Sequence, residues 1–299
     1  MSYQPRREPL AIMRIIDNLD EMTETARGWL AGGSVGFVPT KGHLHAGHLV
    51  LIQAARQECE ISVVSIYLDT ATPGPGTNPA AYPQYLVQDL QLLTSANVDV
   101  AFLPRAGDMY PPDFSTSLSL TGPLADRLEG ASRPDYLRRM ATGIVKLFQL
   151  VRPDIAYFGQ KDAQQVAIIH RIVRDLNIDI SLRVLPTVRE NDGLAMASSN
   201  AALSPAERQA AAVIYRALLA GKALVEKGER RHVTVEKAMA DLVAGEAAIR
   251  LDYAALCRAD TFAGVDTITP GILLVIAAFA GKIRLADNVL WASDGHWLL

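Results

Sequence analysis

Residues 34–52 read SVGFVPTKGHLHAGHLVLI, and this stretch decides the fold. The run 34–40 is apolar and is ended by Pro and Gly, whereas residues 49–56 have the character of a helix. The segment therefore predicts a strand, a tight loop and a helix. A helix that begins directly after such a loop points backbone N–H groups at whatever lies in front of it, which favours an anion.

The same alternation continues along the chain. Further apolar runs predict strands, and the segments between them have helical character. The predicted strands lie at residues 61–68, 98–104 and 154–159, and the predicted helices at residues 85–96 and 136–151. Alternating strands and helices indicate a parallel sheet with helices on both faces. We therefore predict a Rossmann-like α/β domain over residues 1–188.

The texture changes near residues 187–192, where we place a domain boundary. Residues 205–227 predict one long helix, opened by Ser204 as the N-cap, with Glu207 completing a capping box. The later segments YAALCRAD, ILLVIAAF and KIRLADNVL predict short strands. Residues 189–299 are therefore expected to form a smaller α+β domain.

Bulk composition argues against several classes of partner. The chain has 299 residues, a formal net charge of −3 and a pI near 6.1, so it has no general attraction to nucleic-acid phosphates. The longest apolar run, 272–280, is about half of what spans a bilayer, and the N-terminus lacks the apolar stretch of a signal peptide. Cys59 and Cys257 are expected to be small core residues in a reducing compartment. We expect a cytoplasmic protein without nucleic-acid or membrane partners.

The histidines of the opening segment are the first candidates for chemistry. His45 and His48 are three residues apart in a loop that contains glycine, and both imidazoles can turn toward phosphate oxygens at the helix N-terminus. There they would donate to the charge that develops on an α-phosphate as pyrophosphate leaves, whereas His43 is expected to point elsewhere. A solvated helix cap and a metal site are the alternatives. A third ligand is missing nearby in sequence, so no metal is expected to be bound directly by protein side chains.

A second candidate cluster follows the predicted strand 154–159. Lys161 would stand over the crevice at the carboxyl end of that strand and neutralise phosphate charge, and Asp162 could accept from a ribose or coordinate Mg²⁺ through water. The alternative is a solvated Lys–Asp pair on a surface turn. Glu129 and Arg133 form either a loop that fixes a carboxylate or a structural ion pair across a dimer contact.

The segment DTATPGPGTNPAAYP, residues 69–83, is the part of the chain richest in Pro and Gly. It follows a predicted parallel strand, and loops at the carboxyl ends of such strands line the ligand crevice. We predict a mobile wall of a pocket, with a plain surface connector as the alternative.

The loop PTKGHLHAGHL resembles the loop of the HxGH nucleotidyltransferase superfamily, and specifically that of the pantothenate synthetase family, which usually reads PTMGALHxGHL. Four further segments resemble that family in order: residues 127–165, 186–200, 203–211 and 255–265. The resemblance implies a Rossmann-like domain with a smaller C-terminal lid, a homodimer, and a reaction in which ATP and pantoate give pantoyl-adenylate that β-alanine then attacks. ATP and Mg²⁺ are the expected cofactors, and a small acid and a small amine the expected partners.

The resemblance also implies roles for individual positions. The positions of His45, His48 and Lys161 are catalytic in that family. The nucleotide site would comprise Pro39, Thr40, Lys41, Gly47, Gly159, Asp162, Val188, Met196, Ser198 and Ser199. The acid site would comprise Lys41, Asp69, Thr72, Tyr82, Arg133, Tyr136 and Gln165, of which Gln165 matches a glutamine that hydrogen-bonds pantoate.

Several positions depart from the family pattern, and all of them fall in the expected site. Lys41 stands where the family has methionine, Asp69 replaces asparagine, Thr72 replaces glutamine, Tyr136 replaces histidine, Ala197 replaces serine, and Ser199 replaces an arginine that reaches phosphate. Losing an arginine that faces phosphate removes a charge-assisted hydrogen bond, and Lys41 is a candidate to compensate.

These departures favour a ligase that makes an acyl-adenylate from an altered acid or couples it to an altered amine. A genuine pantothenate synthetase is the alternative. A nucleotidyltransferase, whose product would retain the nucleotide, and a non-catalytic nucleotide-binding protein are the remaining possibilities.

Overall fold

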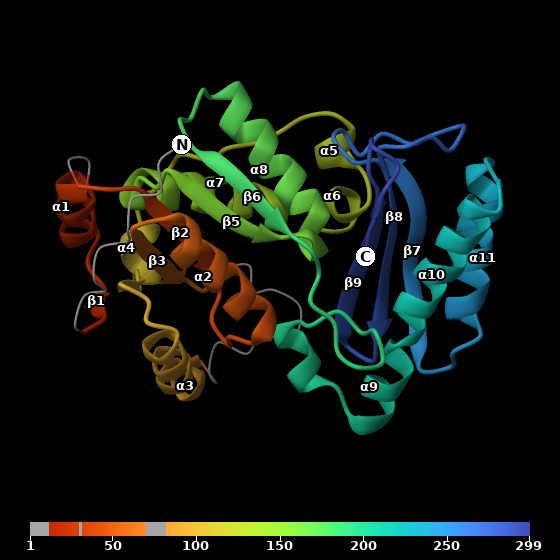
Figure 1. The fold of residues 1–299 in the computed structure, drawn as a ribbon, viewed down its shortest axis with the longest axis horizontal. Helices are drawn as coiled ribbons and strands as arrows, with labels where there is room; N and C mark the ends of the chain where they lie inside the picture. Colours follow the sequence, from red (N-terminus) through yellow and green to blue (C-terminus); the bar gives the residue numbers. More distant parts are fainter. Residues whose placement is uncertain (1–11, 30–31, 70–81) are drawn as a thin grey trace.

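The structure is a computed structural model, and it describes residues 12–29, 32–69 and 82–299. Two sheets follow one another along the long axis of the molecule, the first built from the N-terminal part of the chain and the second from the C-terminal part (Figure 1). The expected pocket wall at residues 69–83 falls almost entirely outside the described residues, and so does Thr72.

The first sheet has six strands in the order β1-β4-β3-β2-β5-β6, and all of its strand pairs are parallel. The strands are β1 Arg14–Ile16, β2 Val35–Thr40, β3 Ile61–Ile66, β4 Val100–Phe102, β5 Ile155–Gly159 and β6 Ser181–Leu185. The main helices are α1 Leu19–Trp29, α2 Ala46–Glu58, α3 Tyr82–Ser95, α7 Pro134–Val151 and α8 Ala163–Asp175. Short helices lie between them: α4 Ala106–Met109, α5 Pro123–Asp126, α6 Glu129–Ser132 and the 3₁₀ turn η2 Gln160–Asp162.

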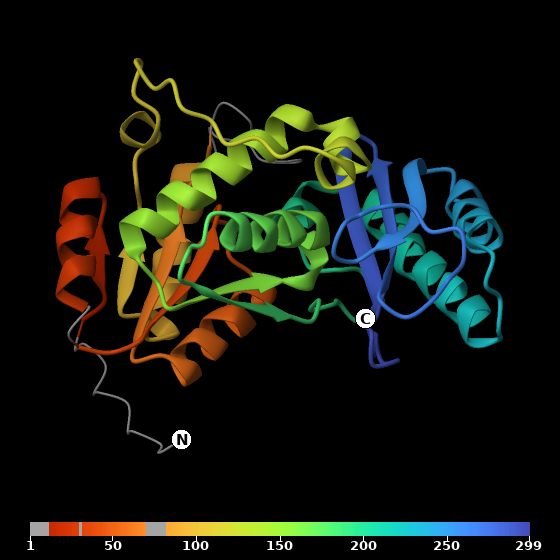
Figure 2. The same cartoon turned by 90° about the horizontal axis from the view of Figure 1, so that it is seen from above.

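Helices cover both faces of this sheet, with α2 on one face and α7 and α8 on the other (Figure 2). Successive side chains of a strand point to opposite faces, and the centre of β2 shows this directly. Phe37 packs against Phe148 of α7, with ring centroids 6.4 Å apart, whereas Val38 packs in a separate cluster with Ile52 of α2. A strand buried on both faces has a continuous apolar run in its sequence. The parallel sheet with helices on both faces confirms the predicted α/β fold.

The second sheet is antiparallel, with the order β10-β9-β8-β7. Its strands are β7 Ile249–Arg258, β8 Ile272–Ala280, β9 Ile283–Trp291 and β10 Trp297–Leu298. The helical elements of this part are η3 Ser198–Ala202, α9 Pro205–Ala211, α10 Val213–Glu226 and α11 His232–Ala244. Helices α10 and α11 pack together on the sheet (Figure 1). This antiparallel sheet with its helices confirms the expected smaller α+β fold of the C-terminal part.

The prediction of one helix over residues 205–227 is wrong, because the helix divides at Ala212 into α9 and α10. Helix α9 packs on β7 and β8, whereas α10 packs on α11, β8 and β9. The capping box is confirmed: the Ser204 N–H donates to Glu207 Oε2 at 2.8 Å, and the Glu207 N–H donates to Ser204 Oγ at 3.3 Å.

Cys59 and Cys257 are buried free thiols, as expected for core residues. Among the described residues, the helices are all too short or too polar to cross a bilayer. The expected boundary between residues 188 and 189 falls between β6 and η3, and the division into two domains there stays a prediction.

Candidate active site

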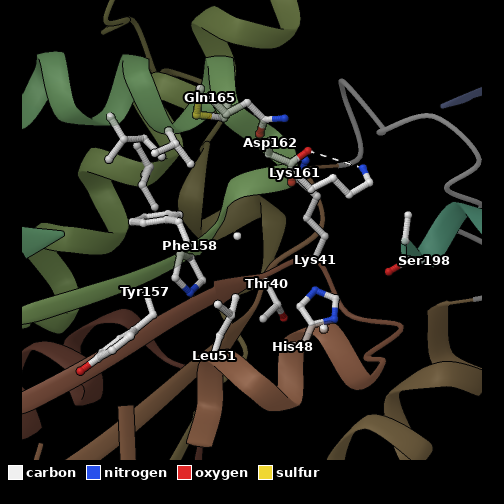
Figure 3. A pocket seen from close by; sticks show the side chains of 18 of the residues that line it. Thr40, Lys41, His48, Leu51, Tyr157, Phe158, Lys161, Asp162, Gln165 and Ser198 are labelled. Carbon is white, nitrogen blue, oxygen red and sulfur yellow. Dashed lines mark ion pairs between the residues drawn. The ribbon is translucent and has the colours of Figure 1, made fainter. Parts of the chain in front are cut away.

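The carboxyl ends of β2, β3 and β5 meet at one edge of the parallel sheet, where ligands of such sheets bind. Lys41 follows β2, Asp69 lies just beyond β3, and Lys161 sits in η2 directly after β5. These residues line a cavity of about 320 Å³. Figure 3 shows Lys41, His48 and Lys161 around this space, with Ser198 facing it from the C-terminal part of the chain.

His45 and His48 form a capping box at the start of α2. The Gly47 N–H donates to His45 Nδ1 at 3.2 Å, and the His45 N–H donates to His48 Nδ1 at 3.2 Å. A ring nitrogen that accepts carries no proton, so each neutral ring carries its proton on Nε2. The Nε2–H groups are therefore the ones left to donate to a ligand in the cavity.

The two imidazoles are held in the neutral form. Burial lowers the pKa of His45 to about 4, and the charge of Lys161 acts in the same direction. Burial lowers the pKa of His48 to about 3, with His45, His43 and Lys161 adding to it. Near pH 7 both side chains are thus neutral donors, and Lys161 supplies the positive charge.

The loop before α2 is shaped by left-handed backbone and by a buried carboxylate. Gly42 and His43 have φ values of 80° and 54°. The N–H groups of His43 and Leu44 donate to the two oxygens of Asp89, at 2.7 Å each, and Asp89 is only 2% exposed. His43 stacks on Tyr85 at 4.0 Å, away from the cavity lining, so the expectation that it points elsewhere is confirmed.

Gly47 has a steric reason to be glycine. A Cβ at this position would lie 2.9 Å from the His45 ring, closer than real Cβ contacts. A side chain there would displace the imidazole that caps α2. Gly47 thus keeps the histidine in place as well as leaving the helix N-terminus open to a ligand.

One end of the cavity is bounded by two segments from different parts of the chain. Lys161 Nζ lies 3.8 Å from Asp162 Oδ1 (Figure 3). Ser198 Oγ donates to the carbonyl oxygens of His43 at 2.9 Å and Gly42 at 3.4 Å. This contact joins the start of η3 to the histidine loop, so both segments share one wall.

A chain of hydrogen bonds marks the other end of the cavity. Lys41 Nζ donates to the Tyr136 hydroxyl at 2.6 Å, and that hydroxyl donates to Gln165 Oε1 at 3.2 Å. The Lys41 side chain is exposed to solvent, while its ammonium contacts both the hydroxyl and the ring of Tyr136. Desolvation lowers the pKa of Lys41, but Tyr136, Asp162 and Glu129 together outweigh it, so the net shift is upward and the ammonium stays charged.

Arg133 lies behind Tyr136 and outside the cavity lining. Its guanidinium stacks 3.9 Å from the Tyr136 ring centroid, and it pairs with Glu129 at 3.1 Å. Arg284 of β9 approaches the same carboxylate at 3.5 Å. Arg133 thus takes part in an ion pair within one chain, which supports the Tyr136 ring from behind.

Arg139 and Tyr67 are site residues that sequence reasoning missed. Arg139 lines the cavity and donates to both oxygens of Asp69, at 2.5 and 2.7 Å. Tyr67 also lines it, and its buried hydroxyl has no hydrogen-bond partner among the residues that the structure describes. Arg139 lies three residues after Tyr136, a position already noted as a departure from the family pattern, and this proximity was the available signal.

Most of the expected site residues reach the cavity. The lining includes Pro39, Thr40, Lys41, His45, Gly47, His48, Asp69, Tyr136, Gly159, Lys161, Asp162, Gln165, Val188, Met196 and Ser198. Ser199 and Arg133 are not part of the described lining. Tyr82 is the first residue of α3, and its side chain lies outside the part of the chain that the structure describes. Within the described ranges, no group of three or more His, Cys, Asp or Glu side chains is arranged to hold a metal ion.

Comparison with known proteins shows one family that matches nearly the whole chain. The pattern of the pantoate-beta-alanine ligase family matches residues 14–290. The pantothenate synthetases of Thermosipho melanesiensis and Heliobacterium modesticaldum are each 43% identical over 279 residues, covering 93% of this chain and 99% of theirs.

Solved structures of pantothenate synthetases have the same fold. That of Thermus thermophilus has a TM-score of 0.86 at 38% identity, covering 94% of this chain and all of that one. The pantoate-beta-alanine ligase of Francisella tularensis, complexed with beta-gamma ATP and beta-alanine, has a TM-score of 0.73 at 30% identity, with 93% and 97% covered.

The fold, the site and these relatives together define an ATP-dependent ligase that joins an acid to an amine. The chain belongs to the pantoate-beta-alanine ligase family. The resemblance read from its sequence motifs is thereby confirmed.

Proposed function

We propose that this chain makes pantothenate from pantoate, β-alanine and ATP by way of pantoyl-adenylate. The observation that carries the proposal is the neutral donor pair His45 and His48 at the N-terminus of α2, opposite Lys161, in a chain that matches pantothenate synthetases over 93% of its length. A pantoate carboxylate oxygen attacks the α-phosphorus of ATP and pyrophosphate leaves. The amine of β-alanine then attacks the acyl carbon, AMP leaves, and the amine loses a proton.

The histidines and Lys161 would act on the first step. Negative charge grows on the α-phosphate and on the leaving pyrophosphate, and fixed donors aimed at developing charge are worth more than mobile water. The Nε2–H groups of the two histidines would donate to it, and Lys161 would neutralise it. Asp162 would hold Mg²⁺ through water or accept from the ribose, and Val188, Met196 and Ser198 would complete the nucleotide wall.

The acid would lie at the opposite end of the cavity. Pantoate combines a carboxylate and two hydroxyls with an apolar dimethyl centre. Lys41, Tyr136 and Gln165 offer polar groups, and Met140 and Leu51 line the same cavity with apolar surface. The hydroxyls and the carboxylate of pantoate would bind to the polar groups and its methyl groups to the apolar wall.

A second candidate is the same chemistry on an altered acid. It is motivated by the Asp69–Arg139 pair and by the Tyr67 hydroxyl, which has no hydrogen-bond partner within the described part of the chain. Both add polar groups to this part of the cavity. An unsatisfied buried hydroxyl is costly, so a ligand that bonds to Tyr67 would gain from its presence. The preferred acid would then carry a further polar group that pantoate lacks.

Pyrophosphate exchange into ATP separates the two candidates. We would screen pantoate against other 2-hydroxy acids and dicarboxylates, and then β-alanine against other amines for AMP release. Pantoate as the best acid and pantothenate as the product support the first candidate. Another acid preferred by more than about tenfold in kcat/KM, a difference of about 1.4 kcal/mol, supports the second.

Two alternative functions predict different products in the same assay. A nucleotidyltransferase would give a product that retains the nucleotide instead of free AMP. A non-catalytic protein would bind ATP and release no AMP with any acid. We further propose a cytoplasmic homodimer that uses Mg²⁺, which size measurement in solution and titration of exchange activity with the metal would test.

A further inference from the structure

Asn288 of β9 reaches from the second sheet to the turn that carries Lys161. β9 contacts η2 and lies on the side of the second sheet that faces the first sheet (Figure 1). Asn288 Nδ2 donates to the carbonyl oxygens of Gln160 and Lys161, both at 3.0 Å. Asn288 is 2% exposed, so solvent cannot replace these bonds.

The turn itself is short and has no side-chain cap. η2 is a three-residue 3₁₀ turn, and neither it nor α8, which follows it, has a side-chain hydrogen bond at its N-cap. Such short turns have little stability of their own. Gln160 donates to Asn288 Oδ1 at 3.3 Å and to the Leu298 carbonyl at 3.1 Å, so this neighbour of Lys161 is also held by the second sheet.

Asp287, the residue before Asn288, holds the segment after β6, which lines the same cavity. Asp287 accepts two bonds from Arg189, at 2.6 and 3.2 Å, and the side chains of this pair are 4% and 11% exposed. Arg189 follows Val188, which lines the cavity. Burial raises the pKa of Asp287, while the charges of Arg189 and Lys161 oppose that shift, which agrees with their proximity.

We infer that Asn288 is a positioning residue for Lys161, and that the Asp287–Asn288 pair sets the distance between the Lys161 turn and the segment after β6. The inference rests on the proposed function only in giving Lys161 its role at the phosphates. Displacing a binding group by about 1 Å can cost on the order of 10²-fold in rate. A buried amide that holds two backbone carbonyls next to that lysine therefore matters for more than stability.

A double-mutant cycle tests the inference, with ATP affinity by calorimetry and kcat for AMP release as readouts. Asn288→Ala should lower ATP affinity and kcat by about tenfold or more, an effect of the kind expected for a misplaced group. In a Lys161→Ala background the same change should alter either readout by less than about twofold, since the group being positioned is gone. Equal effects in both backgrounds, or no effect in the first, would overturn the inference.

Two further variants separate positioning from folding. Asn288→Asp keeps the shape but turns a carboxylate oxygen toward the two carbonyls, so it should reproduce the loss even if Asn288→Ala does not fold. Asp252→Asn weakens the pair of Asp252 with Arg284 on the same sheet, away from η2. It should lower the melting temperature while leaving ATP affinity unchanged. A loss of ATP affinity in this control equal to that in Asn288→Asp would count against positioning.

The same measurements distinguish a failure of the proposed function. If the unmodified chain binds ATP but releases no AMP with any acid, the function fails, and the affinity cycle still decides the role of Asn288. If it does not bind ATP at all, both proposals fail.

Discussion

Lys41 Nζ lies 2.6 Å from the Tyr136 hydroxyl and 4.7 Å from the centroid of the Tyr136 ring. The same hydroxyl donates to Gln165. The Arg133 guanidinium stacks on the Tyr136 ring and fixes its position. The Lys41 ammonium that bonds to this tyrosine is therefore also held in one position in the cavity wall. In the proposed reaction, this arrangement would make Lys41 the anchor for the acid carboxylate.

Replacing the anchor should weaken use of the acid. We expect Lys41→Met to lower kcat/KM for the acid by about tenfold or more, since a charge-assisted hydrogen bond contributes roughly 1.5–3 kcal/mol. Tyr136→Phe removes the hydroxyl but keeps the ring and the ammonium, so its effect should be smaller. Steady-state kinetics with varied acid measure both. Improved turnover of pantoate by Lys41→Met would instead make Lys41 a residue that excludes pantoate.

Removing one of the two histidine donors should slow adenylation. His48→Ala eliminates an Nε2–H that has no acceptor among the described residues. Losing a donor to developing charge typically costs about 10²-fold or more. Pyrophosphate exchange measures this step directly. His43→Ala is the matched control, because His43 stacks on Tyr85 outside the cavity and should leave exchange within a few-fold. An unchanged rate in His48→Ala would remove His48 from the mechanism.

Asp89 should prove essential for the shape of the histidine loop. Asp89→Asn replaces one of its two acceptor oxygens with an NH₂ group that faces a backbone N–H, which should lower the free energy of unfolding by about 1–3 kcal/mol. ATP affinity should fall with it, because the loop ends at the start of α2. Urea unfolding and calorimetry measure the two effects. On the same helix, Thr94→Ala removes only an exposed bond to Leu90 and should change stability by less than ~0.5 kcal/mol.

How far the sequence predicted the fold depended on burial. β2 and β3 are buried on both faces, and their continuous apolar runs identified them. β1 has three residues and β6 is largely exposed, so neither gives a clear periodic signal. The sequence gives no signal for the helix break at Ala212, because the alanines of this segment all favour a helix. The division arises because α9 and α10 pack on different partners.

The site residues also differ in how well the sequence predicts them. His45, His48 and Lys161 lie in contiguous motifs, where spacing and a preceding strand indicate chemistry. Asp89 acts on a loop 46 residues away, and Asn288 on a carbonyl 128 residues away. Contacts of that separation depend on the tertiary fold, and one sequence contains no pattern that joins them.

The neutral histidines should also make stability depend on pH. In the unfolded chain histidine titrates near 6.5, whereas the folded values are about 4 for His45 and about 3 for His48. Between these limits the unfolded state binds more protons, so stability is full above about pH 6.5 and is lost as the pH falls toward 4. Each histidine should contribute a slope of ~1 kcal/mol per pH unit in this window.

Urea unfolding at pH 7, 6 and 5 measures that slope. His48→Gln cannot titrate, so its stability should fall less steeply than that of the unmodified chain over the same range. Identical slopes would mean that His48 is not held neutral by the fold. Exchange activity should show no histidine limb between pH 5.5 and 7, because both side chains stay in the donating neutral form there. A loss of activity with a midpoint near 6.5 would mean that at least one histidine titrates as it does in water, and that burial does not set its charge.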